Sequence, residues 1–210
     1  MYKVNDSLVE KMQKKQRGNR TFGLFMGVIF LIMATIFVFT NFILISVYVD
    51  GESMEPTLKS SEVLFANKNI APEEGDIIVI DGEKESENGS GYDWLIKRAI
   101  VIGQKDKTIF VKIENGKVLV GEDLNDLQEL KETYLPENTS TPDGIFPYWE
   151  INEGEIFYLG DNRKNSKDSR SEYGTCSVKQ VVGVVPEWAL SMRGLSRFLY
   201  DAGKYFSNLF

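Results

Sequence analysis

Ser53 and Lys97 are the two residues of this chain whose surroundings best suit covalent chemistry. Ser53 stands between the flexible Gly51 and a rigid Met-x-Pro-Thr segment, which could hold its hydroxyl exposed. An ordinary turn has the same composition, so this segment alone fits both interpretations. The 210 residues contain no histidine, which excludes Ser-His-Asp and Cys-His nucleophiles, HExxH zinc sites and any imidazole base. A nucleophilic Ser53 would therefore need a neutral lysine or a carboxylate to take its proton.

Lys97 lies in Trp94–Ile102, the most apolar stretch of residues 50–210. A lysine is almost wholly protonated at neutral pH unless burial lowers its pKa, so a lysine base has to be buried. Most of the other lysines lie in polar segments and do not meet this condition. Successive side chains of a strand point to opposite faces, so Lys97 and Arg98 cannot be buried by the same surface. The competing interpretation is an edge strand that points Lys97 to solvent.

A third candidate is Gly160–Arg170, GDNRKNSKDSR, which is dense in side chains that form local hydrogen bonds. A solvated loop is the alternative interpretation. A calcium loop is disfavoured because Arg163 occupies the position of an expected oxygen ligand. The single Cys176 can form neither an internal disulfide nor a CxxC site. We expect no metal and no other cofactor.

Charge divides the chain into a basic head and an acidic body. Residues 1–20 hold six Lys/Arg and two Asp/Glu, a charge of +4, and the other 190 hold 18 and 29, a charge of −11. Residues 21–49 carry no charge; as a helix they would reach about 43 Å, more than the ~30 Å hydrocarbon core of a membrane. Bulky residues at the end of this run disfavour a cleaved signal peptide. We predict a basic cytoplasmic tail over 1–20, a single transmembrane anchor over 21–48, and the remainder outside the cell, with no nucleic-acid partner.

Residues 49–189 have the composition of one mainly β domain. Short runs rich in β-branched residues alternate with Gly, Asn and Asp turn signals, and these runs are 63–66, 76–80, 94–102, 108–113, 117–120, 155–159 and 180–185. Asn115-Gly116 is typical of a two-residue hairpin turn, and 82–91 of an exposed loop. Leucines spaced by three predict a short helix over 122–133. Residues 190–210 predict an amphipathic helix, which packs either on the domain or in the membrane interface.

Taken in order, these segments resemble bacterial type I signal peptidase (leader peptidase), in its Gram-positive, single-anchor form. The matching motifs are Ser53-Met54-x-Pro56-Thr57-Leu58, Gly75-Asp76-Ile77, Lys97-Arg98 and Gly160-Asp161-Asn162-Arg163-x-x-Ser166-x-Asp168-Ser169-Arg170. Each motif is weak alone, but the ordered set is specific. The resemblance implies an antiparallel β catalytic core with a smaller inserted lobe at about 103–155. It also implies a serine endopeptidase of the bacterial cell membrane that removes signal peptides from exported precursors.

The resemblance assigns a role to each site residue. Ser53 would be the nucleophile and Lys97 the general base, and the Ser53 backbone N–H would stabilise the oxyanion. Ser166 would hydrogen-bond and orient the lysine amine, as aspartate does in a triad. Asp168 and Arg170 would pair and hold their loop against the dyad.

The resemblance further implies substrates with small residues at positions −1 and −3 of the cleavage site, selected by shallow apolar pockets. The lining candidates by family match are Val47, Val49, Met54, Leu58 and Ile96. Three positions depart from the family pattern: Gly51 replaces a serine of some members, Leu95 a frequent tyrosine, and 102–106 a frequent Gly-x-x-Gly-Asp. These departures affect the pocket and not the dyad. The partners implied are secretory precursors and the lipid bilayer.

The main alternative function is a catalytically silent or specialised homologue that assists the assembly of surface proteins or pili. Retention of both Ser53 and Lys97 argues against it, because a silent relative needs neither. A self-cleaving Ser/Lys repressor is disfavoured by the anchor. A penicillin-binding enzyme is disfavoured because no Ser-x-x-Lys motif occurs at Ser53.

Overall fold

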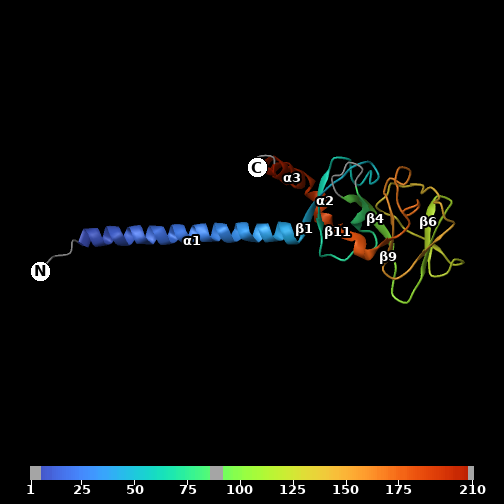
Figure 1. Ribbon diagram of the computed structural model, residues 1–210, viewed down its shortest axis with the longest axis horizontal. Helices are drawn as coiled ribbons and strands as arrows, with labels where there is room; N and C mark the ends of the chain where they lie inside the picture. Colours follow the sequence, from blue (N-terminus) through green and yellow to red (C-terminus); the bar gives the residue numbers. More distant parts are fainter. Residues whose placement is uncertain (1–5, 86–91, 208–210) are drawn as a thin grey trace. The chain divides into compact units, whose positions relative to one another are not determined.

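The computed structural model describes residues 6–85 and 92–207, so part of the loop predicted over 82–91 lies outside the described residues. The chain divides into two compact units, Met1–Ile43 and Leu44–Phe210. Figure 1 shows the elements of both, coloured along the sequence.

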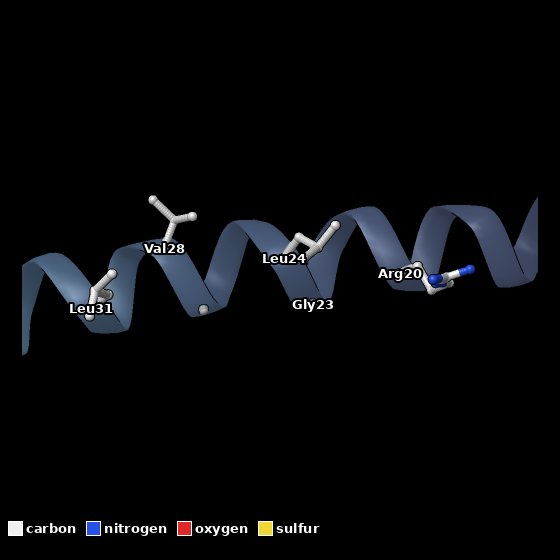
Figure 2. A pocket seen from close by; sticks show the side chains of 6 residues that line it. Arg20, Gly23, Leu24, Val28 and Leu31 are labelled. Atoms are coloured by element: carbon white, nitrogen blue, oxygen red, sulfur yellow. The ribbon is translucent and has the colours of Figure 1, made fainter.

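The first unit contains one long helix, α1 (Asp6–Phe42). Its segment Arg20–Val38, 19 residues long, is long and apolar enough to cross a membrane. A hollow lined by Gly23 and Gly27 runs along it (Figure 2). A Cβ added to either glycine would meet nothing within 4 Å, so this hollow is the space left by two missing side chains.

The predicted boundary of the anchor at residue 48 is wrong, because α1 ends at Phe42. Residues 44–48 instead form strand β1 (Leu44–Tyr48), which pairs with β2 (Val63–Asn67) along its whole length. The uncharged run 21–49 is thus divided between the helix α1 and the strand β1. Leu44 and Val47 of β1 are buried in the domain. Hydropathy alone does not distinguish a lipid-facing residue from a core-facing one.

The second unit confirms the prediction of a mainly β, antiparallel fold. A seven-stranded sheet has the order β1-β2-β11-β3-β4-β9-β10, and a four-stranded sheet has the order β7-β6-β5-β8. The other strands of the larger sheet are β3 (Ile77–Glu85), β4 (Tyr92–Ile102), β9 (Glu155–Leu159), β10 (Cys176–Ser177) and β11 (Val181–Val185). The smaller sheet contains β5 (Ile109–Glu114), β6 (Lys117–Gly121), β7 (Gln128–Glu129) and β8 (Trp149–Ile151). The helical elements are η1 (Val178–Gln180), α2 (Glu187–Ser191) and α3 (Arg193–Ser207).

The smaller sheet lies between β4 and β9 in the sequence, within the lobe predicted at about 103–155. Asn115 and Gly116 join β5 to β6 with φ angles of 53° and 77°, as a two-residue hairpin turn requires. The helix predicted over 122–133 is wrong. The Asp123 carboxylate instead accepts the backbone N–H of Asn125 at 2.9 Å, which makes a turn, and β7 then pairs with β6.

Two apolar clusters fix β4 in the middle of the larger sheet, between β3 and β9. Ile100 and Val101 belong to the cluster shared with the smaller sheet, together with Trp149 and Phe157. Ala99 belongs to the other cluster. A central strand packed in this way gives its side chains fixed positions, which a catalytic group needs.

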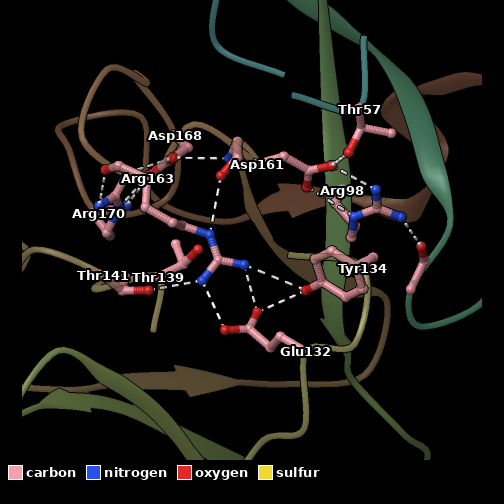
Figure 3. A network of polar contacts seen from close by, with 12 residues as sticks. Thr57, Arg98, Glu132, Tyr134, Thr139, Thr141, Asp161, Arg163, Asp168 and Arg170 are labelled. Carbon is pink, nitrogen blue, oxygen red and sulfur yellow. Dashed lines mark hydrogen bonds and ion pairs between the residues drawn. The ribbon is translucent and has the colours of Figure 1, made fainter. Parts of the chain in front are cut away.

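A buried ion pair connects the lobe to the loop that follows β9 (Figure 3). The Arg163 side chain is 0% exposed, and its Nη1 donates to Glu132 Oε2 at 2.8 Å and to Thr141 Oγ1 at 2.7 Å. Its Nε donates to the carbonyl of Gly160 at 3.0 Å. Glu132 and Thr141 belong to the lobe, so Arg163 holds the loop after β9 against it.

A second buried pair extends this network to the segment that carries Ser53. Arg98 Nε on β4 donates to Asp161 Oδ1 at 2.8 Å, and the guanidinium lies 3.9 Å from the centroid of the Tyr134 ring. The Thr57 hydroxyl donates to the other oxygen of Asp161. Strand β4, the lobe and the segment around Ser53 are therefore held by one set of polar contacts (Figure 3).

We predict that Glu132→Gln lowers the free energy of unfolding by about 3 kcal/mol, because it leaves the Arg163 charge buried without a carboxylate. The matched control is Glu129→Gln, which breaks the exposed pair with Lys117 and should cost less than ~1 kcal/mol. Both are measured by denaturant unfolding of the full chain in detergent. Equal losses in the two variants would contradict the role given to this network.

Candidate active site

Ser53 lies in the loop between β1 and β2, on a turn that is held by buried side chains. Gly51 has a φ of +83°, a conformation that favours glycine, and this bend precedes the serine. Met54 and Leu58 are fully buried beneath the turn, and the N–H of Leu58 donates to the carbonyl of Met54 at 2.9 Å. Ser53 itself is half-buried, so its hydroxyl is held at the surface of a rigid loop.

Lys97 lies on the central strand β4 and is only 5% exposed, so the edge-strand interpretation is wrong. Its Nζ donates to Ser53 Oγ at 2.8 Å and to the carbonyl of Ile96 at 2.9 Å. Burial lowers the pKa of Lys97 from 10.5 to about 8, against the opposing attraction of the Asp168 carboxylate. A neutral amine at this distance can accept the proton of the serine hydroxyl.

The loop that follows β9 lies against the nucleophile segment. The N–H of Asn162 donates to the carbonyl of Ser53 at 3.0 Å, and its side-chain amide donates to the carbonyl of Glu52 at 3.1 Å. A Cβ on Gly160 would lie 2.2 Å from Ser166 Oγ and 2.4 Å from the Ser53 carbonyl oxygen. Only glycine allows this close approach of the two loops.

Ser166 is brought to the same place, but the hydrogen bond expected from it to the Lys97 amine is not formed. The Ser166 hydroxyl oxygen is buried and has no hydrogen-bond partner within the described part of the chain. The amine bonds to Ser53 and to the Ile96 carbonyl instead. The orienting role of Ser166 therefore stays a prediction, and Ser166 lines the same pocket as Ser53 and Lys97.

Asp168 and Arg170 form a bidentate ion pair. The Arg170 Nε and Nη2 atoms each lie 2.8 Å from an oxygen of Asp168, and both side chains are almost fully buried. Asp168 also accepts the N–H of Gly160 at 3.0 Å, and Arg170 Nη1 donates to the carbonyl of Arg163 at 2.7 Å. The pair thus fixes both ends of the 160–170 loop.

Two hollows meet at Ser53 and Lys97. The larger is open and has a volume of about 740 Å³; Glu52 and Ser166 are among its lining residues. The smaller has a volume of about 90 Å³, the share of about three water molecules in the liquid. Within the residues described, no cluster of carboxylates or thiols could hold a metal ion.

The predicted pocket residues divide into two groups. Val49, Met54 and Ile96 line the smaller hollow. Leu95, noted above as a departure from the family pattern, also lines it, together with Tyr48 and Trp94, which received no role from the sequence. Val47 and Leu58 line neither hollow and are buried, so their assignment to the pocket stays a prediction. Val47 and Val49 are both 3% exposed, but only Val49, which follows the last residue of β1, reaches the smaller hollow.

The residues that sequence reasoning missed form the hydrogen bonds and ion pairs that position the loops around Ser53. Asn162, Asp161 and Thr57 stand in the quoted motifs but received no role, because their partners lie between 63 and 110 positions away in the sequence. Glu132 and Tyr134 lie outside every motif. No local pattern marks a carboxylate whose partner comes from another lobe.

We predict that Lys97→Met raises the stability of the chain at about pH 6. Below pH 8 the lysine is protonated in both states, and the folded state carries the cost of the buried charge; the fall in pKa from 10.5 to about 8 corresponds to about 3 kcal/mol. The gain should shrink as the pH rises from 8 to 10.5, because there only the unfolded parent keeps the proton. Unfolding in detergent across this range, with the exposed Lys59→Met as control, measures it. A variant less stable than the parent at about pH 6 would contradict the claim that the charged Lys97 destabilises the folded state.

Comparison with known proteins gives a consistent result. A family model described as signal peptidase, peptidase S26, matches residues 22–188. Signal peptidase I P of Bacillus subtilis subsp. natto is 32% identical over 172 residues, covering 74% of this chain and 82% of that protein. Signal peptidase I of Bacillus caldolyticus is 32% identical over 185 residues, covering 82% and 91%.

The crystal structure of a signal peptidase I from Enterococcus faecalis V583 is also similar, with 23% identity and a TM-score of 0.39 over 55% of this chain and 97% of that one. The assignment rests on the sequence matches, since the family model spans most of the chain and the relatives are matched over most of their length. The chain therefore belongs to the signal peptidase family, peptidase S26, and is a serine endopeptidase.

Proposed function

We propose that this chain is a membrane-anchored signal peptidase I that cleaves signal peptides from exported precursors with a Ser53/Lys97 dyad. The observation that carries the proposal is the 2.8 Å contact between Lys97 Nζ and Ser53 Oγ on a buried central strand. A lysine with a pKa of about 8 is neutral in a useful fraction of molecules near neutral pH, so it can act as the base that the absent histidine would otherwise supply.

The reaction divides into acylation and deacylation. Lys97 takes the hydroxyl proton as Ser53 Oγ attacks the scissile carbonyl carbon, and the Ser53 backbone N–H stabilises the oxyanion. The protonated lysine then gives its proton to the amine that leaves with the mature protein. Neutral Lys97 next deprotonates a water molecule, which hydrolyses the ester and releases the signal peptide with a free carboxylate.

The roles of the three supporting residues follow from their contacts. The Asp168–Arg170 ion pair holds the 160–170 loop, and through Gly160 it sets the distance between that loop and Ser53. The Ser166 hydroxyl is buried, has no partner among the residues that the structure describes, and lies beside the dyad, where a small rotation of the lysine side chain on protonation would give it a partner. Ser166 would then orient the charged amine.

Substrate selection rests on the smaller hollow. A volume of about 90 Å³ accepts a small side chain and is too small for an aromatic one. Val49, Met54 and Ile96 form its apolar wall, so small residues at −1 and −3 of the precursor fit best. The extended precursor would add to the exposed backbone beside these residues as an extra strand.

The helix α1 is the proposed anchor. Its apolar segment Arg20–Val38 is long enough to span the bilayer, and six Lys/Arg precede Thr21. Positive residues favour the cytoplasmic side, so the β domain would lie outside the cell, where signal peptides emerge.

We predict that Ser53→Ala and Lys97→Met each abolish cleavage of a precursor with an Ala-x-Ala site, because one removes the nucleophile and the other its base. The expected loss is at least about 10²- to 10⁴-fold for the base alone. Lys59→Met, an exposed lysine outside both hollows, is the control and should cleave at the parental rate.

Cleavage is followed by gel analysis with purified full-length protein in detergent. Parental activity in either variant would refute the dyad. An inactive parent chain would favour instead a silent homologue that assists surface-protein assembly.

A further inference from the structure

The C-terminal helix α3 exposes four large apolar side chains on one face. Leu195, Phe198, Leu199 and Tyr205 recur at helical spacing and are 45%, 67%, 44% and 67% exposed. Ser196, on another side of the same helix, is 0% exposed. An ordinary surface helix buries its apolar face and exposes its small polar residues, and α3 does the reverse.

Polar and aromatic contacts hold α3 in this orientation. Arg193 Nη1 lies 3.1 Å from a Glu62 carboxylate oxygen, and Arg197 Nη1 donates to the carbonyl of Ser61 at 2.8 Å. The Tyr200 ring stacks on that of Tyr48 in β1, with centroids 6.2 Å apart. Because these partners lie in β1 and just before β2, α3 is fixed to the edge of the larger sheet where β1 lies.

This edge is also the place where the chain passes from α1 into the domain. Strand β1 begins six positions after Val38, the last residue of the apolar segment, so a membrane crossed by α1 must lie near β1. Trp188 and Met192, before α3, add exposed apolar surface at 42% and 39% exposure. Tryptophan and tyrosine are the side chains enriched at membrane interfaces.

Charge favours an anionic lipid surface over other apolar partners. The helix α3 carries three basic residues and one acidic residue, a charge of +2. Residues 44–210 as a whole carry 18 Lys/Arg and 29 Asp/Glu, a charge of −11, since 21–43 are uncharged. Arg193 is paired with Glu62, but α3 is still less acidic than the domain as a whole, so it is suited to lie in the headgroup region of anionic lipids while the acidic body of the domain stays away from them.

We propose that α3 lies in the plane of the membrane that α1 crosses, on its extracytoplasmic surface, with the exposed apolar face of α3 at the boundary between headgroups and acyl chains. This inference rests on the proposed anchor, and it gives the domain a second attachment besides α1. Two attachments restrict the rotation of the domain on its single tether, and so keep the Ser53 site at a constant height above the bilayer.

The test places one fluorescent label on each face of α3 in the full chain, reconstituted into vesicles of phosphatidylcholine and phosphatidylglycerol. Phe198→Cys carries the label on the apolar face and Lys204→Cys carries it on another face. The native Cys176 is buried, so labelling is directed to the introduced thiol. We expect nitroxide lipids to quench the label at 198 at least about twofold more than the label at 204, in high salt as well as low.

Flotation with the vesicles separates the two proposals. A chain that does not float would refute the anchor. A chain that floats but shows equal quenching at both positions would overturn the role of α3. A response at 198 that depends on protein density and not on nitroxide lipid would also overturn it, because a second copy would then cover this face.

A functional comparison completes the test. The triple variant Leu195→Ser, Phe198→Ser, Leu199→Ser should cleave a short peptide in detergent at the parental rate, but should process a membrane-inserted precursor several-fold more slowly. Equal losses in both assays would mean that α3 only supports the fold, and no loss in either would mean that it has no role at the membrane.

Discussion

The burial of the Lys97 amine is the constraint on which the rest of this structure depends. An ammonium group is stable in water, so the fold has to remove water from around it before it can act as a base. The central position of β4, between β3 and β9, removes that water. The cost is a strained group in the middle of the sheet, as is common where function opposes stability.

The carboxylates near the dyad are prevented from cancelling this effect. A carboxylate free to pair with Lys97 would return its pKa toward 10.5. Instead Asp161 pairs with Arg98 and Asp168 with Arg170, and Lys97 makes no ion pair with any described residue. The guanidinium groups of Arg98 and Arg170 thus hold the loops together. They also neutralise the carboxylates of Asp161 and Asp168, so neither carboxylate pairs with Lys97. One arrangement therefore provides rigidity and leaves the pKa of Lys97 low, as the proposed mechanism requires.

Sequence reasoning predicted the strands and the burial of Lys97 because both have local signals. The Asn115-Gly116 turn and the β-branched runs each occupy a few consecutive residues, and Lys97 stands in an unusually apolar strand. It did not predict the end of α1, because lipid-facing and core-facing apolar residues look alike. It also did not predict the helix-breaking turn at Asp123, which depends on one side chain bonding to the backbone.

The supporting network was harder to predict for a different reason. Glu132 and Arg163 meet only because the lobe folds against the loop after β9, and no spacing in the sequence records that contact. The resemblance predicted a hydrogen bond between Ser166 and the Lys97 amine, but the amine donates to the Ile96 carbonyl instead. A family match indicates which residues lie near one another, but not the rotamer of each side chain. Long-range contacts and side-chain rotamers could therefore be obtained only from the structure.

The most direct measurement is the titration of the Lys97 amine itself. Full-length protein with isotopically labelled lysine, in detergent, gives one NMR signal that is absent from Lys97→Met and can be followed as the pH changes. A midpoint near 8 is the predicted result. A midpoint near 10.5, the value of an exposed lysine, would contradict the claim that burial makes this residue a base.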